Sequence, residues 1–311
     1  MAKKPEEIVS LMRFTTLDEL VKMIRLGGIP LYDTERWEDR CDAAFVERGV
    51  REMNNSKTTG NYGVMCFMGQ TKKEKEEEEK IGKDGEKNDG DTQYSYSPRE
   101  TIHHWKGYAG GKDGVGIKIC FKPEVLLHAF LQKKYSDTKE LKKSLEESDN
   151  ILKGNGKIFG KMEYRTIEKI KERLTESKAE NFFFTKRIAF RDEREYRLVQ
   201  YGKQVAPSCK DDQKWIRAMG VRGFIPVDNW SELIDRIVFS PFSDKRYVEK
   251  LRKGEISKES LRLDSQEYKI LKDLLSAEVN YRSTILNKKS LLELAASDQG
   301  KTQSTKGGDK S

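Results

Sequence analysis

Residues 182–200 (FFFTKRIAFRDEREYRLVQ) carry acidic, basic and large apolar side chains at a density that neither a core strand nor a solvated helix usually shows. Glu193, Glu195 and Arg197 recur at every second position, so in an extended chain their side chains share one face. Two like charges two positions apart repel each other, so a nearby basic group or a functional demand must account for the two glutamates. The alternative is an edge strand with a surface Glu–Arg ladder, which adds little stability.

The segment 103–121 combines aromatic rings with a glycine-rich loop. Trp105 and Tyr108 stand three positions apart, on one face of a helix predicted over residues 101–109, and His104 and Tyr108 stand four apart, one above the other. Glycines in the following loop would let a backbone approach a ligand closely, and a ring beside them could stack on a planar group. The alternative is that the aromatic rings pack in the core and the glycines only form a turn.

Arg13 stands in an otherwise apolar predicted strand, residues 11–16, where a single guanidinium group is unusual. It either pairs with a carboxylate, for which Asp42 and Glu163 are the candidates, or binds an anion such as phosphate. The sequence leaves both interpretations of Arg13 open.

Asp39 and Asp42 stand three positions apart, a spacing that suits a metal site or, as we favour, the cap of a helix. The four cysteines include no C-x-x-C pair and the chain has three histidines, so no metal is expected. No G-x-G-x-x-G follows a predicted strand and no G-x-x-x-x-G-K-[ST] occurs, so Rossmann and P-loop chemistry are poorly supported.

The composition limits the class of protein. Apolar residues make up 35% of the 311 residues and charged residues 36%, so some segments are expected outside the core. The net charge of +8 permits a nucleic acid or another anionic partner without requiring one. No signal peptide and no apolar run of transmembrane length is apparent, which predicts a reduced, cytoplasmic protein with no membrane partner.

The elements that must position these groups alternate irregularly between strands and helices. Without a strict β-α-β order, the sequence predicts the α+β class, with a single domain over residues 10–280 that has a mixed sheet and flanking helices. Residues 71–92, rich in Lys, Glu, Gly and Asp, are predicted to be a disordered insertion. Residues 135–157 are expected to form a charged helix and loop, and residues 296–311 a disordered tail.

With these stretches in view, the chain resembles a broad bacterial family that carries only a domain-of-unknown-function label. Its members show the motifs W-x-x-Y-A…G-V-x-I-x-F and K-R-x-A-F-x-x-E-x-E-x-R-L, and the resemblance extends over residues 11–250. The family label implies no activity. The matching stretches are Arg13–Phe14, WEDRCD (37–42), Cys66–Phe67, WKGYAGGKDGVGIKICF (105–121) and KRIAFRDEREYRL (186–198).

A more distant likeness is to arginine-type ADP-ribosyltransferases, which carry an Arg on an early strand and a late E-x-E. Arg13 and Glu193-x-Glu195 occur here in that order, although the S-T-S strand of those enzymes would fall at residues 66–68, which read C-F-M. This likeness implies an ADP-ribosyltransferase-like fold. It also implies that Glu195 bonds a ribose hydroxyl of NAD and stabilises an oxocarbenium-like state, while Glu193 orients or deprotonates an acceptor.

The same likeness implies ligand-binding roles for the remaining candidates. Arg13 would hold the pyrophosphate of NAD, Trp105 or Tyr108 would stack on a ring, and Arg197 would line the same cleft. NAD would then be a substrate, and no metal would be needed.

The resulting hypothesis is a nucleotide-handling enzyme of the ADP-ribosyltransferase or NAD glycohydrolase type, acting as a bacterial defence or toxin effector. Its partners would be a nucleotide or another small molecule, with a nucleic acid or a protein as acceptor. Two alternatives remain. One is a metal-dependent nuclease in which Asp39, Asp42, Glu193 and Glu195 converge on magnesium. The other is a non-catalytic module that binds nucleic acid or protein through its Lys/Arg surface.

Overall fold

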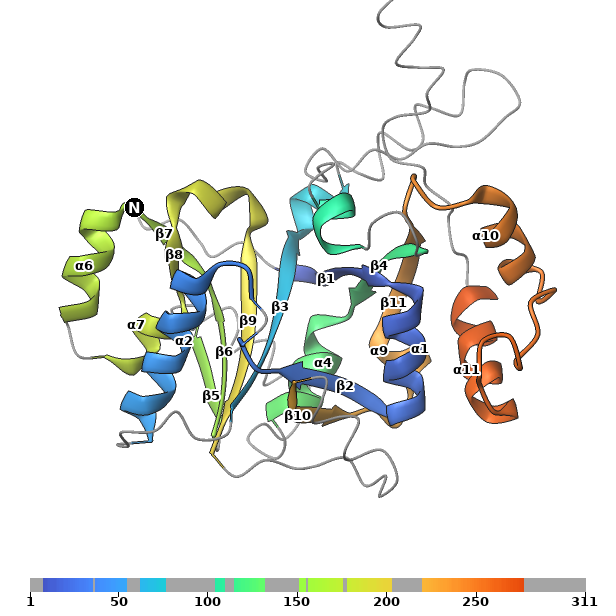
Figure 1. The fold of residues 1–311 in the computed structure, drawn as a ribbon, viewed down its shortest axis with the longest axis horizontal. Coiled ribbons are helices and arrows are strands. Elements are labelled where there is room, and N and C mark those ends of the chain that lie inside the picture. Colours follow the sequence, from blue (N-terminus) through green and yellow to red (C-terminus); the bar gives the residue numbers. More distant parts are fainter. Residues whose placement is uncertain are drawn as a thin grey trace, which may run out of the picture.

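In the computed structural model of the chain, the described residues are 8–35, 37–54, 62–76, 104–109, 115–131, 151–154, 156–175, 178–202 and 220–276 (Figure 1). The strands are β1 (Ile8–Thr16), β2 (Gly28–Tyr32), β3 (Tyr62–Thr71), β4 (Gly116–Phe121), β5 (Ile151–Gly154), β6 (Lys157–Lys161), β7 (Glu163–Arg165), β8 (Thr185–Arg187), β9 (Glu195–Tyr201), β10 (Val221–Pro226) and β11 (Ile234–Phe239). The helices are α1 (Leu17–Leu26), α2 (Arg40–Met53), α4 (Pro123–Leu131), α6 (Ile167–Thr175), α7 (Ala179–Phe183), α9 (Trp230–Leu233), α10 (Lys245–Arg252) and α11 (Ser265–Ser276), together with the π-helix η2 (His104–Tyr108) and the 3₁₀-helix η3 (Ile188–Glu193). Helices and a mostly antiparallel sheet in one domain confirm the α+β class.

The limits of α1 follow from its capping residues. The Thr16 hydroxyl accepts a hydrogen bond from the amide of Glu19 at 3.2 Å, which starts the helix. Gly27 ends it in the left-handed region at φ 65°, a conformation that glycine adopts without a Cβ clash. The chain then turns directly into β2, so α1 connects β1 to β2 and contacts both strands.

β3 is the strand on which the large sheet divides. The sheet runs β11-β4-β1-β3-β9-β6-β5, and its neighbouring strands pair antiparallel. β1 pairs with the end of β3, where Met12 lies opposite Met68, whereas β2 pairs with its beginning, where Tyr32 lies opposite Val64. β2 also carries β10. Among the described strands, the one parallel pair is β7–β8, which forms a separate two-stranded sheet.

The strand register decides which side chains share a face of the sheet. Met12 lies opposite Met68, and Met68 lies opposite Glu195, so these three side chains leave the sheet on one face. Arg13 follows Met12 in β1 and therefore leaves on the other face, where α1, α4 and α11 cover the larger core cluster. The face of Glu195 carries two smaller clusters, one around Trp105 and one between β9 and the neighbouring helices α2 and α7 (Figure 1).

Two segments bear on the predicted organisation. The described part of the charged stretch 135–157 contains β5 and the first residue of β6, where a helix and loop were expected. This hairpin joins the sheet through β9, a pairing that local charge composition does not reveal. Within the predicted insertion 71–92, Thr71 completes β3 and residues 72–76 are helical. The rest of that insertion and the predicted tail 296–311 lie outside the described residues.

Candidate functional site

Arg197, on β9, is the most deeply buried charged residue of the candidate site. Its Nη1 and Nη2 donate to the two carboxylate oxygens of Asp42 at 3.0 and 2.6 Å, and its Nε donates to Glu195. Nη1 also donates to the carbonyl of Phe183 at 3.1 Å, and the guanidinium lies 5.0 Å from the ring centre of Trp37. Burial of an arginine is tolerated only when its donors are satisfied in this way.

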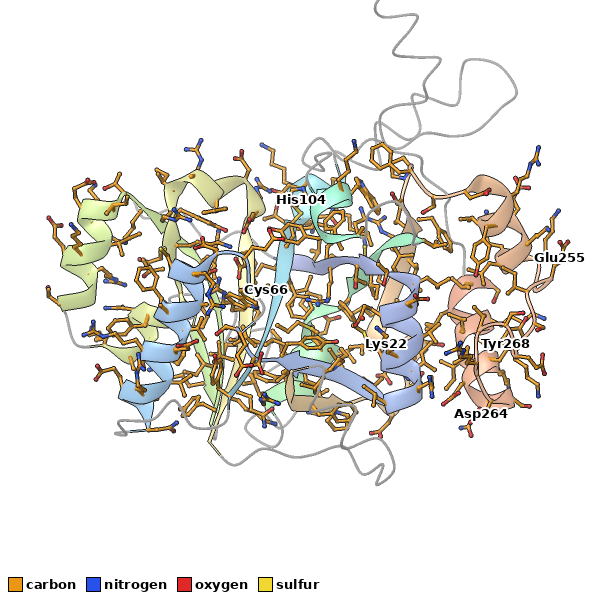
Figure 2. The ribbon with its side chains drawn as sticks, in the orientation of Figure 1. Lys22, Cys66, His104, Glu255, Asp264 and Tyr268 are labelled. Carbon is orange, nitrogen blue, oxygen red and sulfur yellow. The ribbon has the colours of Figure 1, made fainter. Side chains whose placement is uncertain are left out.

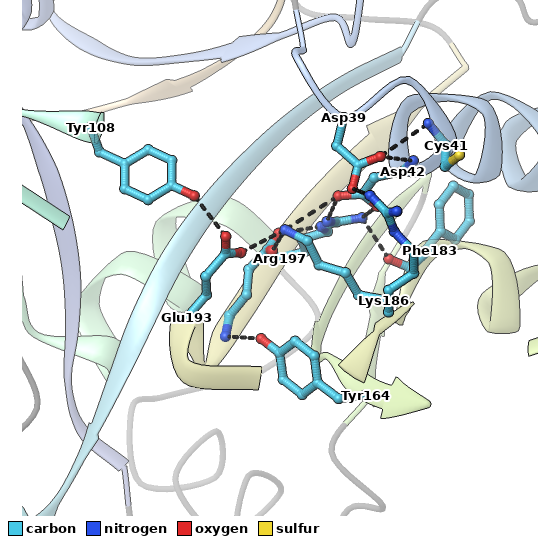
Figure 3. A network of polar contacts seen from close by, with 11 residues as sticks. Asp39, Cys41, Asp42, Tyr108, Tyr164, Phe183, Lys186, Glu193 and Arg197 are labelled. Carbon is cyan, nitrogen blue, oxygen red and sulfur yellow. Dashed lines mark hydrogen bonds and ion pairs between the residues drawn. The ribbon is translucent and has the colours of Figure 1, made fainter. Parts of the chain in front are cut away.

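Lys186, on β8, joins three carboxylates at one nitrogen (Figure 3). Its Nζ donates to Glu193 at 2.6 Å and to Glu195 at 2.8 Å, and lies 3.5 Å from Asp42. Lys186 is therefore the basic group that the repulsion between the two glutamates predicted. We call Asp42, Lys186, Glu193, Glu195 and Arg197 together the charge cluster.

The start of α2 brings Asp42 into the charge cluster. Asp39 caps that helix, because its Oδ1 accepts hydrogen bonds from the amides of Cys41 and Asp42 at 3.1 and 3.2 Å. Its other oxygen accepts a hydrogen bond from Arg187 at 2.9 Å. The capping role favoured for Asp39 is confirmed, while Asp42 points inward and binds Arg197.

The two glutamates reach Lys186 from different elements. Glu193 is the last residue of η3 and Glu195 the first of β9, and Arg194 between them adopts the left-handed conformation with φ 46° and ψ 45°. The extended geometry considered for Glu193, Glu195 and Arg197 thus holds only from Glu195 onward, where Glu195 and Arg197 share a face. The amide of Glu195 donates to the Tyr164 hydroxyl at 2.7 Å, which fixes the start of β9.

Exposure rises steadily along the charge cluster toward Tyr108. The side chain of Arg197 is 0% exposed, that of Glu195 5% and that of Glu193 13%. Tyr108, which is 47% exposed, donates a hydrogen bond from its hydroxyl to Glu193 at 2.7 Å. Glu193 is thus the carboxylate of the cluster that lies nearest to solvent.

The electrostatics of the charge cluster favour its ionised form. Burial alone would raise the pKa of Glu195, but the charges of Arg197 and Lys186 outweigh burial and lower the pKa to about 2. Burial would likewise lower the pKa of Lys186, yet the surrounding carboxylates, Glu195 first, raise it above its ordinary value. Burial and the charge of Glu193 raise the pKa of Tyr108, so its hydroxyl keeps its proton and donates a hydrogen bond to Glu193.

Trp105 and Arg13 do not join the charge cluster. Trp105 is 3% exposed and packs edge-to-face on Phe14 at 5.0 Å between ring centres, so its ring belongs to the core. Arg13 leaves the opposite face of the sheet, and its Nη1 donates to the backbone carbonyl of Cys66 at 3.3 Å, where β1 and β2 separate on β3. Of the six predicted site residues, the structure brings together Tyr108, Glu193, Glu195 and Arg197.

The π-helix η2 explains the different fates of the neighbouring aromatic residues. His104 begins η2 and is labelled in Figure 2. Its buried ring stacks on Phe14 at 5.1 Å and on Tyr108 at 6.4 Å between ring centres, so His104 and Tyr108 lie one above the other as predicted. Trp105 turns inward instead. The glycine-rich loop expected beside these rings, residues 110–114, lies outside the described residues.

The charge cluster contains three carboxylates that could attract a metal ion, but the ammonium group of Lys186 already lies among them. Lys186 occupies the point on which three carboxylates converge, so a metal ion there would have to displace its ammonium group. Over the described ranges, no group of three or more His, Cys, Asp or Glu side chains is arranged to hold a metal ion. Cys66 lies on β3 beside the cluster (Figure 2), where burial and then the charge of Glu195 raise the pKa of its thiol.

Two residues of the charge cluster were not among the predicted site residues. Lys186 lies within the charged stretch that drew attention to the glutamates, so the argument from repulsion could have been extended to it. Asp42 was considered as a metal ligand, a cap or a partner of Arg13, and its pairing with Arg197 depends on the packing of α2 against β9.

None of the described helices combines the length and the apolar character that a membrane crossing requires.

The chain was compared with protein families, curated proteins and solved structures. No protein-family model matches the chain, and neither a curated protein nor a solved structure matches it.

Proposed function

We propose that this chain is a nucleotide-handling enzyme of the ADP-ribosyltransferase or NAD glycohydrolase type, in which Glu193 is the reacting carboxylate. The observation that supports this function is the ammonium group of Lys186, which binds Glu193 and Glu195 while Glu193 stays next to the exposed Tyr108. A carboxylate fixed at the solvent end of a buried charge cluster is pre-organised to meet developing positive charge. Such a charge develops on the ribose carbon of NAD when the nicotinamide–ribose bond breaks.

The chemistry proposed for Glu193 follows from the bond that breaks. Cleavage of the nicotinamide–ribose bond moves its electron pair onto the nicotinamide nitrogen and leaves positive charge on the ribose carbon, which a nearby carboxylate stabilises. A water molecule or an acceptor group then forms a bond to that carbon, and Glu193 accepts its proton as general base. Water yields ADP-ribose, and an acceptor group yields an ADP-ribosylated acceptor.

The remaining residues have supporting roles in this proposal. Glu195 is nearly inaccessible and already binds Arg197 and Lys186, so the role that the ADP-ribosyltransferase likeness gives it passes to Glu193. Tyr108 offers an exposed ring on which a planar group can stack. Arg13 and Trp105 take no part.

Incubation of the pure protein with NAD and candidate acceptors, followed by mass spectrometry of nicotinamide and of the proteins, tests the proposal. The wild type is expected to release nicotinamide, and Glu193→Gln, which keeps the shape of the side chain but removes its charge, to lose roughly 10²–10⁴-fold in rate. Glu163→Gln is the matched control, because Glu163 lies in an exposed ion pair with Arg165. Nicotinamide release that persists in a folded Glu193→Gln protein would reject the mechanism.

The same samples separate the alternative functions. Magnesium-dependent cutting of RNA or DNA without nicotinamide release would favour a nuclease. Binding of nucleic acid that weakens steeply with salt, with no turnover of either kind, would favour the non-catalytic module.

A further inference from the structure

Glu74 caps the short helical segment that follows β3. The amide of Thr71 donates to Oε2 of Glu74 at 3.0 Å, and the amide of Glu74 approaches the Thr71 hydroxyl at 3.5 Å. This reciprocal arrangement is a capping box, and residues 72–76 form the helical turn that it starts. Glu74 is therefore held in one conformation by its own backbone environment.

The second oxygen of the same carboxylate holds Arg194. Nη1 of Arg194 donates to Oε1 of Glu74 at 2.6 Å, and the Glu74 side chain is 8% exposed. The carbonyl of Arg194 also accepts a hydrogen bond from the amide of Gly69 at 3.3 Å. The backbone of Arg194 is thus bound to β3, and its side chain is bound to the helical turn that follows β3.

Arg194 needs such support because its backbone is left-handed, with φ 46° and ψ 45°. A residue with a Cβ adopts this conformation at a cost that glycine avoids. In an extended strand, the Cα atoms of Glu193 and Glu195 would lie roughly 6.6 Å apart on one strand. With the turn at Arg194, Glu193 ends η3 and Glu195 begins β9, and from these two elements their carboxylates reach the same nitrogen of Lys186, at 2.6 and 2.8 Å.

We propose that Glu74 is a positioning residue for the candidate site: its ion pair with Arg194 holds the left-handed turn that directs Glu193 and Glu195 onto Lys186. The effect on turnover rests on the function proposed above, whereas the effect on the geometry of Glu193 does not. The two effects are therefore measured separately.

The geometry of Glu193 is followed through its contact with Tyr108 by ¹³Cζ NMR of labelled tyrosine, with Tyr108→Phe to assign the signal. The charged groups around the Tyr108 hydroxyl are Glu193, Lys186 and Glu195, and the His104 ring stacks on its own. In Glu74→Ala and Arg194→Ala, loss of Glu193 from its position is expected to shift the ¹³Cζ signal and to lower the pKa of Tyr108 toward its ordinary value. Arg194→Gly, which adopts the turn freely, is expected to keep the wild-type signal.

Turnover supplies the second readout. Glu74→Ala is expected to lower kcat for nicotinamide release roughly 10–100-fold with little change in KM, because the reacting group is misplaced while the exposed ring remains. Adding Arg194→Gly to Glu74→Ala is expected to restore most of the loss. Thr71→Ala, which weakens the cap but leaves the Arg194 ion pair intact, is the matched control for folding and should match the wild type in both readouts.

Each outcome separates the two proposals. If the wild type releases no nicotinamide, the NMR series still decides whether Glu74 positions Glu193. If Glu74→Ala and Arg194→Ala both give the wild-type Tyr108 signal and titration, the positioning role is overturned even in an active enzyme. If Arg194→Ala does not fold, Glu74→Ala and Glu74→Gln decide alone, and Glu74→Gln is expected to give the smaller shift because it retains a hydrogen-bond acceptor for Arg194.

Discussion

Arg197 on β9 and Asp42 on α2 form a two-point ion pair in which the guanidinium group is wholly withdrawn from solvent. The pair links a helix near the start of the chain to a strand near the middle of the sheet. Removing one partner would leave the other as an uncompensated buried charge, and the free energy of unfolding should register that loss.

Replacing Arg197 by Met is expected to lower the free energy of unfolding by about 3–5 kcal/mol, because Asp42 and Glu195 lose their buried cation. Urea unfolding measures the change. The control is Arg187→Met, whose side chain is 40% exposed in its ion pair with Asp39. That control should cost less than about 1 kcal/mol. If both variants lost the same free energy of unfolding, the buried ion pairs of Arg197 would not stabilise the fold more than the exposed pair of Arg187.

Acid is expected to weaken the wild type more steeply than Glu195→Gln. The pKa of Glu195 is lowered from 4.5 to about 2 on folding, so its contribution is complete above about pH 5 and is lost as the pH falls toward 2. That contribution is on the order of 3 kcal/mol. The difference in unfolding free energy between wild type and Glu195→Gln should therefore shrink over this range, and a constant difference would count against the lowered pKa.

Two substitutions at Tyr108 are expected to separate its hydroxyl from its ring. Tyr108→Phe removes a hydrogen bond to a charged acceptor, worth roughly 1.5–3 kcal/mol, and should lower kcat for nicotinamide release with little change in KM. Tyr108→Ala also removes a stacking surface worth roughly 1–3 kcal/mol, so its KM should rise as well. Steady-state kinetics with NAD checks both, and an unchanged KM in Tyr108→Ala would exclude stacking.

Trp105 is expected to behave as a core residue. Trp105→Ala should lower the free energy of unfolding by about 3–5 kcal/mol, as large-to-small changes in a core do. Trp105→Phe should cost less and, once folded, should bind NAD with the wild-type KM. A raised KM in a stable Trp105→Phe protein would return Trp105 to the ligand site.

Local patterns predicted the parts of the fold that depend on interactions between close neighbours. The cap at Asp39 is formed with amides two and three positions further along the chain. The alternation of β9 likewise places Glu195 and Arg197 on one face. A short sequence window contains all the atoms that decide these features.

For the partners within the charge cluster, the sequence predicted that a basic group was needed but did not identify the residues. Repulsion between Glu193 and Glu195 required a basic group, and Lys186 is seven residues from the first of them. Asp42 is 155 positions from Arg197, and its arrival depends on how α2 packs. The spacing of residues along the chain does not predict that packing.

Arg13 and Trp105 fell outside the cluster for two different physical reasons. The face that Arg13 takes is set by the pairing of β1 with β3 and of β3 with β9, and a shift of one residue would have reversed it. Trp105 lies in a π-helix, where the three-residue spacing that aligns rings on an α-helix no longer applies. Both outcomes depend on geometry that residue types alone do not specify.

The charge cluster combines three carboxylates with two cations, so with all five ionised it carries one net negative charge within a chain of net charge +8. Asp39 and Arg187 beside it add one charge of each sign and leave the sum unchanged. A field of this kind turns an approaching dipolar molecule. Under the proposed function, NAD would be drawn with its cationic nicotinamide ring toward Glu193 and its phosphates away, so the net charge of the cluster would select the end of the ligand that enters first.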